Sequence, residues 1–307
     1  MRSKGPAPTG GAAALPGGDG APEGALAPGL YLIATPIGAA RDITLRALDI
    51  LRRAEVLAAE DTRSLRRLMD IHAIPLQGRP LWPYHDHNGP AMRPRLMAAL
   101  AEGRSVAYAP EAGTPLVADP GYQLVQAAVA AGAPVHAAPG PSALLAALAV
   151  SGLPSDRFLF AGFPPAPTGA RRRWLKELAA VPATLILYES PKRVRQTLGE
   201  LCEEWGAERQ AALCRELTKR FEEVRRGSLG DLAAGLGDDA PRGEIVLVVD
   251  RGRPAPVGQE GVEAMLRSRR GEMSLKAAVS EVAVETGLPR RTVYQAALRI
   301  ERGEGEA

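Results

Sequence analysis

The sequence predicts an α/β protein with two domains and a small C-terminal helical extension. Short apolar runs alternate with segments of helical periodicity, and Gly- and Pro-rich turns follow several of the apolar runs. A hydrophobic share of 46% in 307 residues is enough for a buried core. Open α/β sheets bind ligands beyond the carboxyl ends of their strands, where these turns lie. The pattern therefore favours a small-molecule pocket shaped by turns.

The first segment of the chain, residues 1–29, is dominated by Gly, Ala and Pro. It has no apolar stretch behind its basic residues Arg2 and Lys4, so a secretory signal is not expected. We interpret it as a disordered leader and place the start of the folded chain at Leu30.

Residues 30–161 are expected to form the first α/β domain, around a mostly parallel sheet. A strand at 30–34 runs through a tight turn into a helix at 43–53, for which Asp42 is the expected N-cap. Further strands are expected at 56–59, 105–109, 135–138 and 159–161, and further helices at 93–101, 122–131 and 142–150. Such alternation is typical of a parallel sheet covered by helices.

The segment 162–169, GFPPAPTG, is expected to be a linker, because its prolines and glycines resist both helix and strand. A second α/β domain is expected over residues 170–250. Its expected helices are 170–180 and 191–205, its strands 185–188, 210–214 and 245–249, and its edge-like segment 222–227.

After a second Gly- and Pro-rich linker at 251–261, residues 261–300 have a helical pattern throughout. Two helices at 274–285 and 292–300 flank a turn at Gly287, as in a helix-turn-helix. A small helical cap or a dimer contact is the alternative interpretation.

Composition excludes several classes of protein. A net charge of +3 is too small for a polybasic nucleic-acid binder. Cys202 and Cys214 form no zinc or disulfide pattern, which is typical of packing residues in a reducing cytoplasm.

No apolar run approaches the length of a membrane span, so a soluble protein is expected. His85 and His87 lie close together, but no second cluster completes a metal site, and no metal is predicted.

Four turns carry the polar residues of interest: TPIG at 35–38, EAGTPLVADPG at 111–121, PGPSA at 139–143 and YESPKR at 188–193. Together with EDTR at 60–63 and RELTKRFEE at 215–223, they closely resemble the ribosomal RNA small subunit methyltransferase I family of the tetrapyrrole methylase superfamily. The resemblance runs from residue 30 to about 249, and the tail resembles the family's helical extension. It implies two α/β domains with S-adenosylmethionine (SAM) in the cleft between them, assembled as a homodimer.

The resemblance also implies the reaction, which is 2′-O-methylation of a cytidine ribose in the decoding region of 16S rRNA in the 30S subunit. SAM carries an activated methyl group, so catalysis depends mainly on orientation, worth roughly 7–11 kcal/mol. The implied cofactor-binding residues are Thr35, Pro36, Gly38, Glu111, Gly113, Thr114, Pro115, Gly140, Ser142 and Ala143. Turn geometry alone is the alternative for each glycine, and helix capping is the alternative for Ser142.

A ribose hydroxyl is a poor nucleophile, so a proton acceptor or a charge stabiliser would help. The candidates in matching segments are Glu60, Asp61, Glu189, Glu216 and Lys219. Lys219 would accept the proton if its pKa were depressed, or stabilise the oxyanion as a cation. For the acids, ion pairs such as Asp61 with Arg63 or Glu216 with Arg215 are the alternative.

RNA contact requires positive charge and stacking surfaces. The candidate residues are Arg63, Arg171, Arg172, Trp174, Lys192 and Arg193, with further basic groups at Arg66, Arg67, Arg290 and Arg291. The cluster at 171–174 offers guanidinium and indole planes for stacking on bases. Solvated helix faces are the alternative interpretation. The segment His85–Asn88 resembles the family's HxHN run, where a role near the RNA or the cleft is expected.

The chain departs from the family pattern at two turns. Ala39 and Ala40 replace the usual Asn-Leu, and Pro110 and Glu111 replace the usual Ser-Asp. Two other functions stay open besides rRNA methylation, and the departures bear on the second of them. One is carbon methylation of a tetrapyrrole intermediate, and the other is a ribosome-assembly factor that has lost methyl transfer. SAM binding separates the last from the other two, and the acceptor separates the first two.

Overall fold

The computed structural model describes residues 24–118, 121–237, 241–252, 259–269, 271 and 273–301. The leader expected at residues 1–29 lies almost wholly outside this range. The chain forms two compact units. The first takes the chain up to Thr35 and then Ile43–Gly140, and the second takes Pro36–Asp42 and the chain from Pro141 onward.

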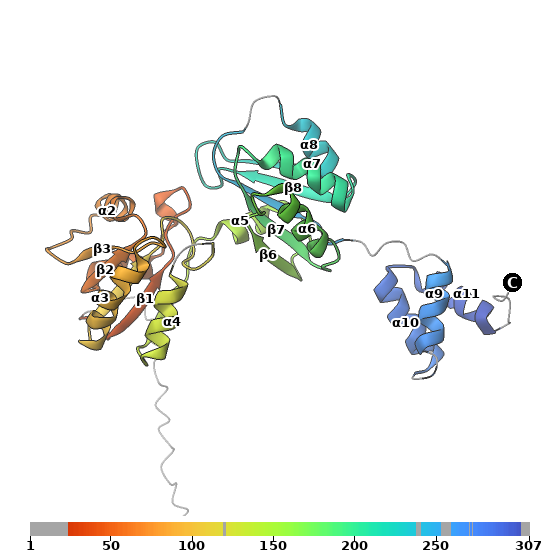
Figure 1. The fold of residues 1–307 in the computed structure, drawn as a ribbon, viewed down its shortest axis with the longest axis horizontal. Coiled ribbons are helices and arrows are strands. Elements are labelled where there is room, and N and C mark those ends of the chain that lie inside the picture. Colours follow the sequence, from red (N-terminus) through yellow and green to blue (C-terminus); the bar gives the residue numbers. More distant parts are fainter. Residues whose placement is uncertain are drawn as a thin grey trace, which may run out of the picture. The chain divides into compact units, whose positions relative to one another are not determined.

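The first unit is built on a parallel sheet of five strands (Figure 1). The strands, in the order β3-β2-β4-β1-β5, are β3 (Leu81–Pro83), β2 (Val56–Ala59), β4 (Ser105–Ala109), β1 (Gly29–Ile33) and β5 (Val135–Ala138). Every neighbouring pair is parallel. All residues of β2 and β4 are buried, because helices cover both faces of such a sheet. The predicted parallel sheet is confirmed.

Two apolar clusters lie on the two faces of this sheet. Helices α1 (Leu45–Arg53) and α2 (Thr62–Ile71) contribute Leu51 and Met69 to one cluster. Helices α3 (Gly89–Ala101) and α4 (Tyr122–Ala130) contribute Leu96 and Leu124 to the other. Along a strand, alternate residues point to opposite faces, so Ile33 enters the first cluster and Leu30 the second.

Three local features of this unit differ from the sequence prediction. Asp42 is not the N-cap of α1; it lies in a short 3-10 helix, η1 (Ala40–Asp42), and the hydroxyl of Thr44 instead accepts a hydrogen bond from Ala47 N at 3.2 Å. The strand β3 and the helix α2 were not predicted. The segment after β3 is a turn, in which the Asn88 side chain accepts from the backbone N–H of His85 at 2.8 Å.

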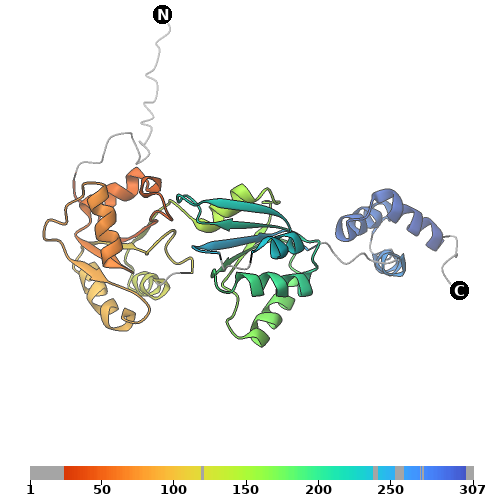
Figure 2. The ribbon, with the colours of Figure 1, turned by 90° about the horizontal axis from the view of Figure 1, so that it is seen from above.

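The second unit contains a mixed sheet of five strands (Figure 2). In the order β6-β7-β10-β8-β9, they are β6 (Phe158–Gly162), β7 (Thr184–Glu189), β10 (Ile245–Val249), β8 (Gln210–Arg215) and β9 (Glu223–Ser228). Only β6 and β7 pair in parallel. Helices α6 (Thr168–Ala179), α7 (Val194–Trp205) and α8 (Leu229–Gly235) cover one face, and α5 (Ala143–Ser151) packs on the other.

The division between the units differs from the linker that the sequence favoured at 162–169. The chain divides at Gly140 and Pro141, and β6 pairs with β7 in the second sheet. The apolar run that becomes β6 looks the same in sequence whichever sheet it joins, because only its pairing partner decides the matter.

The C-terminal helices α9 (Gln259–Arg269), α10 (Leu275–Thr286) and α11 (Arg290–Glu301) surround one apolar cluster of their own. Gly287 closes α10 in the left-handed conformation at φ 68°, which glycine adopts without a Cβ clash. The helical prediction for this region is confirmed. Within the described residues, no helix combines the length and apolarity that crossing a membrane requires.

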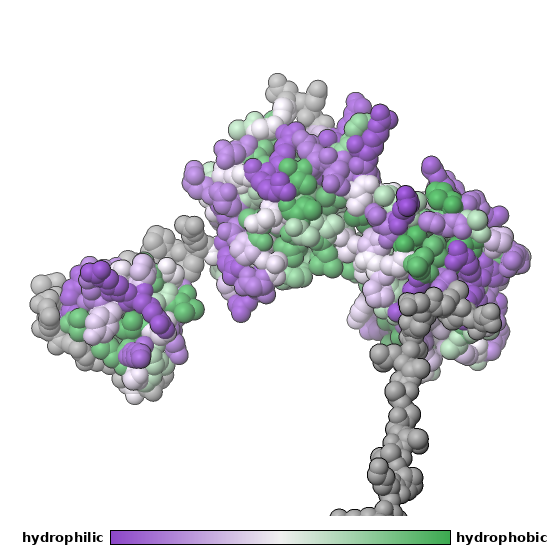
Figure 3. All heavy atoms as spheres, turned by 180° about the vertical axis from the view of Figure 1, so that it is seen from behind, coloured by the Kyte–Doolittle hydropathy of each residue, from purple (hydrophilic) through white to green (hydrophobic). Residues whose placement is uncertain are grey.

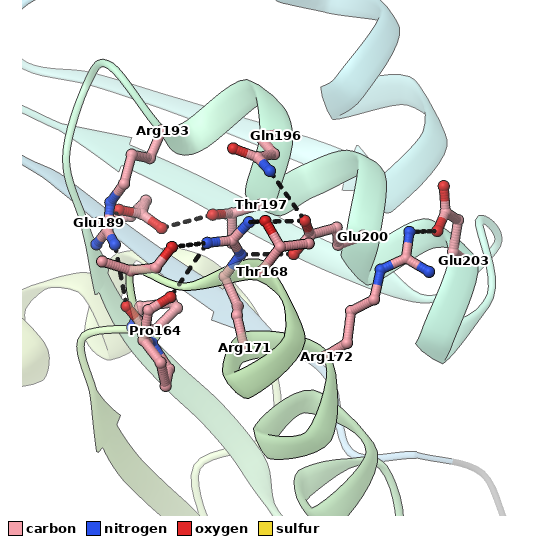
Figure 4. A network of polar contacts seen from close by, with 12 residues as sticks. Pro164, Thr168, Arg171, Arg172, Glu189, Arg193, Gln196, Thr197, Glu200 and Glu203 are labelled. Atoms are coloured by element: carbon pink, nitrogen blue, oxygen red, sulfur yellow. Dashed lines mark hydrogen bonds and ion pairs between the residues drawn. The ribbon is translucent and has the colours of Figure 1, made fainter.

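A buried ion pair joins two helices of the second unit (Figure 4). The Arg171 side chain on α6 is 2% exposed and donates to both carboxylate oxygens of Glu200 on α7, at 2.5 and 2.7 Å. Its remaining nitrogen donates to the backbone carbonyls of Pro165 and Ala166. The pair therefore ties α6, α7 and the preceding turn together.

We expect Glu200→Gln to destabilise the protein by about 3–5 kcal/mol, because it leaves the Arg171 guanidinium buried without a counter-ion. The matched control is Glu203→Gln. Glu203 pairs with Arg172 at 2.6 Å on the same two helices, but both side chains are about half exposed, so its loss should cost under about 1 kcal/mol. Urea unfolding at pH 7 measures the free energy of unfolding of both variants. Equal losses of stability would contradict the structural role of the buried Arg171–Glu200 pair.

The stability that the protein loses in Glu200→Gln should depend on pH. The Arg171 hydrogen bonds hold the pKa of Glu200 below its ordinary value of 4.5, despite the opposing effect of burial. A depressed folded-state pKa adds stability above the ordinary pKa that is lost as the pH falls toward the folded-state value. The stability gap between the wild type and Glu200→Gln should therefore narrow below about pH 4.5. A gap that stays constant down to pH 3 would count against this pairing.

Candidate active site

The carboxyl ends of the parallel strands bring the first group of candidates to one edge of the first sheet. Thr35, just after β1, exchanges two backbone hydrogen bonds with Gly113, at 2.9 and 3.0 Å. The Thr35 hydroxyl also donates to the carbonyl of Pro110 at 3.4 Å. These contacts join the turn after β1 to the loop after β4.

Glu60 follows β2 at the same edge and is half-buried. Its backbone N–H donates to Ala109 O at 3.1 Å, and one carboxylate oxygen accepts from the backbone N–H of Glu111 at 3.1 Å. Among the described residues, the other carboxylate oxygen has no hydrogen-bond partner. The side chain is thus oriented by one contact and keeps an acceptor available.

The loop after β4 contains strained backbone. Gly113 has φ 82°, and Leu116 and Ala118 have φ 73° and 58°. A residue with a side chain pays roughly 1–3 kcal/mol in such a conformation, and strained residues cluster at ligand-binding and catalytic loops. This loop is therefore the strongest binding candidate of the first unit. Two residues of its sequence motif, Asp119 and Pro120, lie outside the described residues.

The turn after β5 requires its glycine for packing. A Cβ at Gly140 would lie 2.9 Å from the Cβ of Ala34, which is closer than side-chain carbons approach. Close packing against Ala34 therefore suffices to explain Gly140. Ser142 occupies the N-cap position of α5, yet its hydroxyl makes no capping hydrogen bond. Capping, the alternative for Ser142, is not what this side chain does.

A second strained loop follows β8 in the second unit. Glu216 and Thr218 have φ 49° and 63°. The Glu216 carboxylate accepts from Lys219 Nζ at 2.9 Å and from Glu244 N at 3.0 Å. Its hydrogen bond with Lys219 is the main cause that lowers the pKa of Glu216. The expected pair of Glu216 with Arg215 is wrong, because Arg215 instead contacts Glu223 at 3.0 Å.

Of the two roles that the sequence left open for Lys219, proton acceptor through a depressed pKa or stabilising cation, the first is wrong. Burial alone would lower the pKa, but hydrogen bonds to Glu216 and Glu244, each at 2.9 Å, outweigh burial and raise the pKa of Lys219. Lys219 is therefore a cation and not a proton acceptor near neutral pH. Sequence reasoning did not single out Glu244, since it lies 25 residues away in a segment without a motif.

The TPIG turn packs on this loop within the second unit. A Cβ at Gly38 would lie 2.5 Å from Lys219 Cγ and 2.6 Å from the hydroxyl of Thr218, so only glycine fits. The next residue, Ala39, donates its backbone N–H to that hydroxyl at 3.1 Å. The turn therefore positions Lys219 through backbone contacts that do not require the family's usual Asn side chain.

Asp61 has a structural role. Its carboxylate caps α2 by accepting from the backbone N–H groups of Arg63 and Ser64, and it pairs with the Arg63 side chain at 3.2 Å. The Arg63 hydrogen bonds lower the pKa of Asp61, which makes it a weaker base. The alternative of an ion pair with Arg63 is confirmed.

Glu189 is unsuited to accept a proton from a substrate. Its side chain is fully buried and bonded to Ser190 N, the Arg193 guanidinium and the Thr197 hydroxyl, at 2.7, 2.8 and 2.5 Å (Figure 4). Arg193 also donates to the Pro164 carbonyl at 3.1 Å. The YESPKR motif therefore has a structural role, because its contacts connect the end of β7 to α7.

The proposed stacking cluster at 171–174 is corrected in part. Arg171 is buried in its pair with Glu200, so it offers no plane to a base. Trp174 is half-buried against the core of the second unit, and Arg172 is exposed but paired with Glu203. Lys192 is exposed.

In the first unit, the rings of His85 and His87 lie 6.0 Å apart, and no group of three or more metal-ligating side chains is found in the described part of the chain.

Comparison with known proteins identifies the family. Residues 29–233 match the model of the tetrapyrrole (corrin/porphyrin) methylases, and residues 256–301 match the RsmI C-terminal HTH domain. Among solved structures, the methyltransferase CobJ superposes with a TM-score of 0.57 at 21% identity, covering 75% of this chain and 96% of that one. That likeness shows a shared fold.

Curated relatives are closer. The chain is 48% identical over 286 residues to the ribosomal RNA small subunit methyltransferase I of Mesorhizobium japonicum, covering 93% of this chain and 96% of the relative. It is 42% identical over 276 residues to the protein of the same name from Pseudomonas aeruginosa, covering 88% and 96%. The chain therefore belongs to the ribosomal RNA small subunit methyltransferase I family of the tetrapyrrole methylases.

Proposed function

We propose that this methyltransferase transfers the methyl group of SAM to the 2′-hydroxyl of a cytidine in the decoding region of 16S rRNA. Membership of the family supports the reaction class, and the relatives' names support the rRNA substrate. The observation that carries the proposal is the coincidence of strain with sequence motif. Four of the six non-glycine residues with positive φ in the described chain lie in loops that carry family residues: 116 and 118 in one unit, 216 and 218 in the other.

The residues of the first strained loop fit a cofactor of this kind. Gly113 has no side chain to block approach, and its left-handed conformation and its pairing with Thr35 fix the loop. We assign SAM binding to this loop through Glu111, Gly113, Thr114 and Pro115. The uncapped hydroxyl of Ser142 is a further proposed contact. When bound, SAM supplies the activated methyl group, and the loop supplies its orientation.

Glu60 is the best proton acceptor among the five candidates. Asp61 and Glu189 are committed to structural contacts, Glu216 is paired with Lys219, and Lys219 is protonated. Among the described residues, the Glu60 carboxylate accepts one hydrogen bond, from Glu111 N, which leaves its other oxygen for a ribose hydroxyl. The Lys219 cation is the proposed stabiliser of developing negative charge.

The departures from the family pattern do not favour a non-catalytic protein. Pro110 contributes its carbonyl to Thr35, Glu111 its N–H to Glu60, and Ala39 its N–H to Thr218. All three contacts come from the backbone, so substitution of the side chains leaves them in place. This supports retained activity over an assembly factor without methyl transfer.

We also propose a homodimer in the cytoplasm, as the resemblance implies. Apolar surface supports an interface. Phe158, Leu159 and Phe163, on edge strand β6 and the turn after it, are 41%, 37% and 53% exposed. Figure 3 shows hydrophobic residues gathered on one face of the second unit. Exposed apolar patches of this kind mark protein interfaces.

Methyl transfer tests the proposed reaction. Labelled SAM is incubated in parallel with 30S subunits, naked 16S rRNA and a precorrin, and the modified product is identified by mass. We expect label on rRNA as 2′-O-methylcytidine. Label on the precorrin instead would establish tetrapyrrole methylation, and SAM binding without transfer to any acceptor would support the assembly factor.

Substitution of Glu60 tests the assigned proton acceptor. We expect Glu60→Gln to lower kcat by about 10²-fold, at the lower end for loss of a general base, with SAM affinity unchanged within about twofold. The matched control is Glu102→Gln, because Glu102 follows α3, has a side chain that is 65% exposed, and should leave kcat unaltered. A Glu60→Gln enzyme with wild-type kcat would remove Glu60 from the mechanism.

A further inference from the structure

The first unit carries a basic depression that methyl transfer itself does not use. It is open, has a volume of about 560 Å³, and lies along helix α2 and the segment that follows it. Its lining residues are Thr62, Arg63, Arg66, Arg67, Asp70, Leu76 and Leu81. We call this depression the α2 groove.

The basic residues of the α2 groove share one face of the helix. Arg63, Arg66 and Arg67 follow the spacing that places side chains on one side of an α-helix, and the acidic Asp70 lies on the same side. The Arg63 and Arg66 side chains are 91% and 52% exposed. Opposite them, Leu76 and Leu81 are half-buried against the core and give the groove an apolar wall. Charge and apolar surface therefore lie side by side.

The arginines of the groove are only partly neutralised. Arg66 is 4.0 Å from the Asp70 carboxylate, at the limit of an ion pair, and Arg63 pairs with Asp61 in an exposed geometry. Among the described residues, Arg67 has no carboxylate within ion-pairing distance. Arg171 and Arg193, by contrast, are committed to internal contacts. The groove thus keeps guanidinium groups available for an anion.

The apolar wall is fixed before any ligand binds. Arg79 donates to the backbone carbonyls of Leu51 and Ala54, at 2.7 and 2.9 Å, and to those of Pro75 and Leu76, both at 3.0 Å. These four hydrogen bonds anchor the chain segment that carries Leu76 to the end of α1. A rigid wall lowers the entropic cost of binding.

We propose that the α2 groove binds the phosphate backbone of the rRNA strand next to the methylated nucleotide. The inference rests on the proposed function and adds the surface that holds its substrate. Helix α2 begins at Thr62, immediately after Glu60 and its cap Asp61, so the groove starts beside the proposed proton acceptor. Guanidinium forks match phosphate oxygens, and the apolar wall accommodates riboses and bases between phosphates.

Binding of RNA by Arg66→Ala/Arg67→Ala tests the groove. The probe is a fluorescent fragment of 16S rRNA that contains the decoding region, titrated by anisotropy at several salt concentrations. We expect the Kd to rise on the order of tenfold and the slope of log K against log salt to fall by about 1.4, since each single-strand phosphate contact contributes about 0.7. Arg66→Lys/Arg67→Lys should keep most of the slope because it keeps both charges.

The matched control is Arg52→Ala. Arg52 is 46% exposed near the end of α1 and, among the described residues, is paired with Asp49. The variant removes one positive charge outside the groove, as the single variant Arg67→Ala does inside it, and should leave the Kd within about twofold. SAM affinity should be unchanged in every variant. Wild-type affinity and slope in the double alanine variant would overturn the groove, even if the enzyme methylates rRNA.

Failure of the reaction is distinguishable from failure of the groove. If the wild type transfers no methyl group to rRNA, the proposed function fails, while a weakened, salt-dependent RNA affinity of the double variant still supports the groove. A wild-type protein that binds an acidic peptide through these arginines but does not bind RNA would overturn the inference.

Discussion

The candidate site of the first unit depends on one pair of contacts, the two backbone hydrogen bonds between Thr35 and Gly113. They join the ends of β1 and β4, which are adjacent strands of a parallel sheet. The central strands β2 and β4 of this sheet are wholly buried, so accessible polar groups are offered by the loops at the carboxyl ends of the strands, and these two hydrogen bonds join two of those loops. The contact of Glu111 N with Glu60, and the strain at Leu116 and Ala118, both lie in the loop after β4.

The second unit uses charge in two ways. Arg171 and Glu200 are both buried and bonded to each other and to groups of the same unit, so the pair holds α6 and α7 together. Around Lys219, two carboxylates hold one cation in a strained loop, and Gly38 allows the TPIG turn to approach it. Buried and satisfied networks add rigidity, whereas the electrostatic role that we propose for Lys219 requires a cation that is partly exposed.

Much of the fold was predictable from the sequence. The strands at Ser105–Ala109, Val135–Ala138 and Ile245–Val249 have the predicted bounds, because each is a short apolar run between turn residues. Helix α2 was missed because its charged sequence buries only Leu65 and Met69, and β3 because it is three residues long and ends in proline.

The site was less predictable, because its chemistry depends on tertiary neighbours. The pKa of Lys219 is raised by hydrogen bonds to Glu216 and Glu244, which outweigh burial, and the burial of Arg171 runs against the usual exposure of arginine. The central claim, that the loop containing Gly113 holds the cofactor, is tested most directly by calorimetric titration of SAM onto Gly113→Val and Gly132→Val. Both glycines have positive φ, at 82° and 72°, but Gly132 lies in the turn between α4 and β5, at the amino end of β5 and away from the loop after β4. We expect SAM binding to be lost in the first variant and kept in the second. Unchanged SAM affinity in a folded Gly113→Val protein would contradict the account.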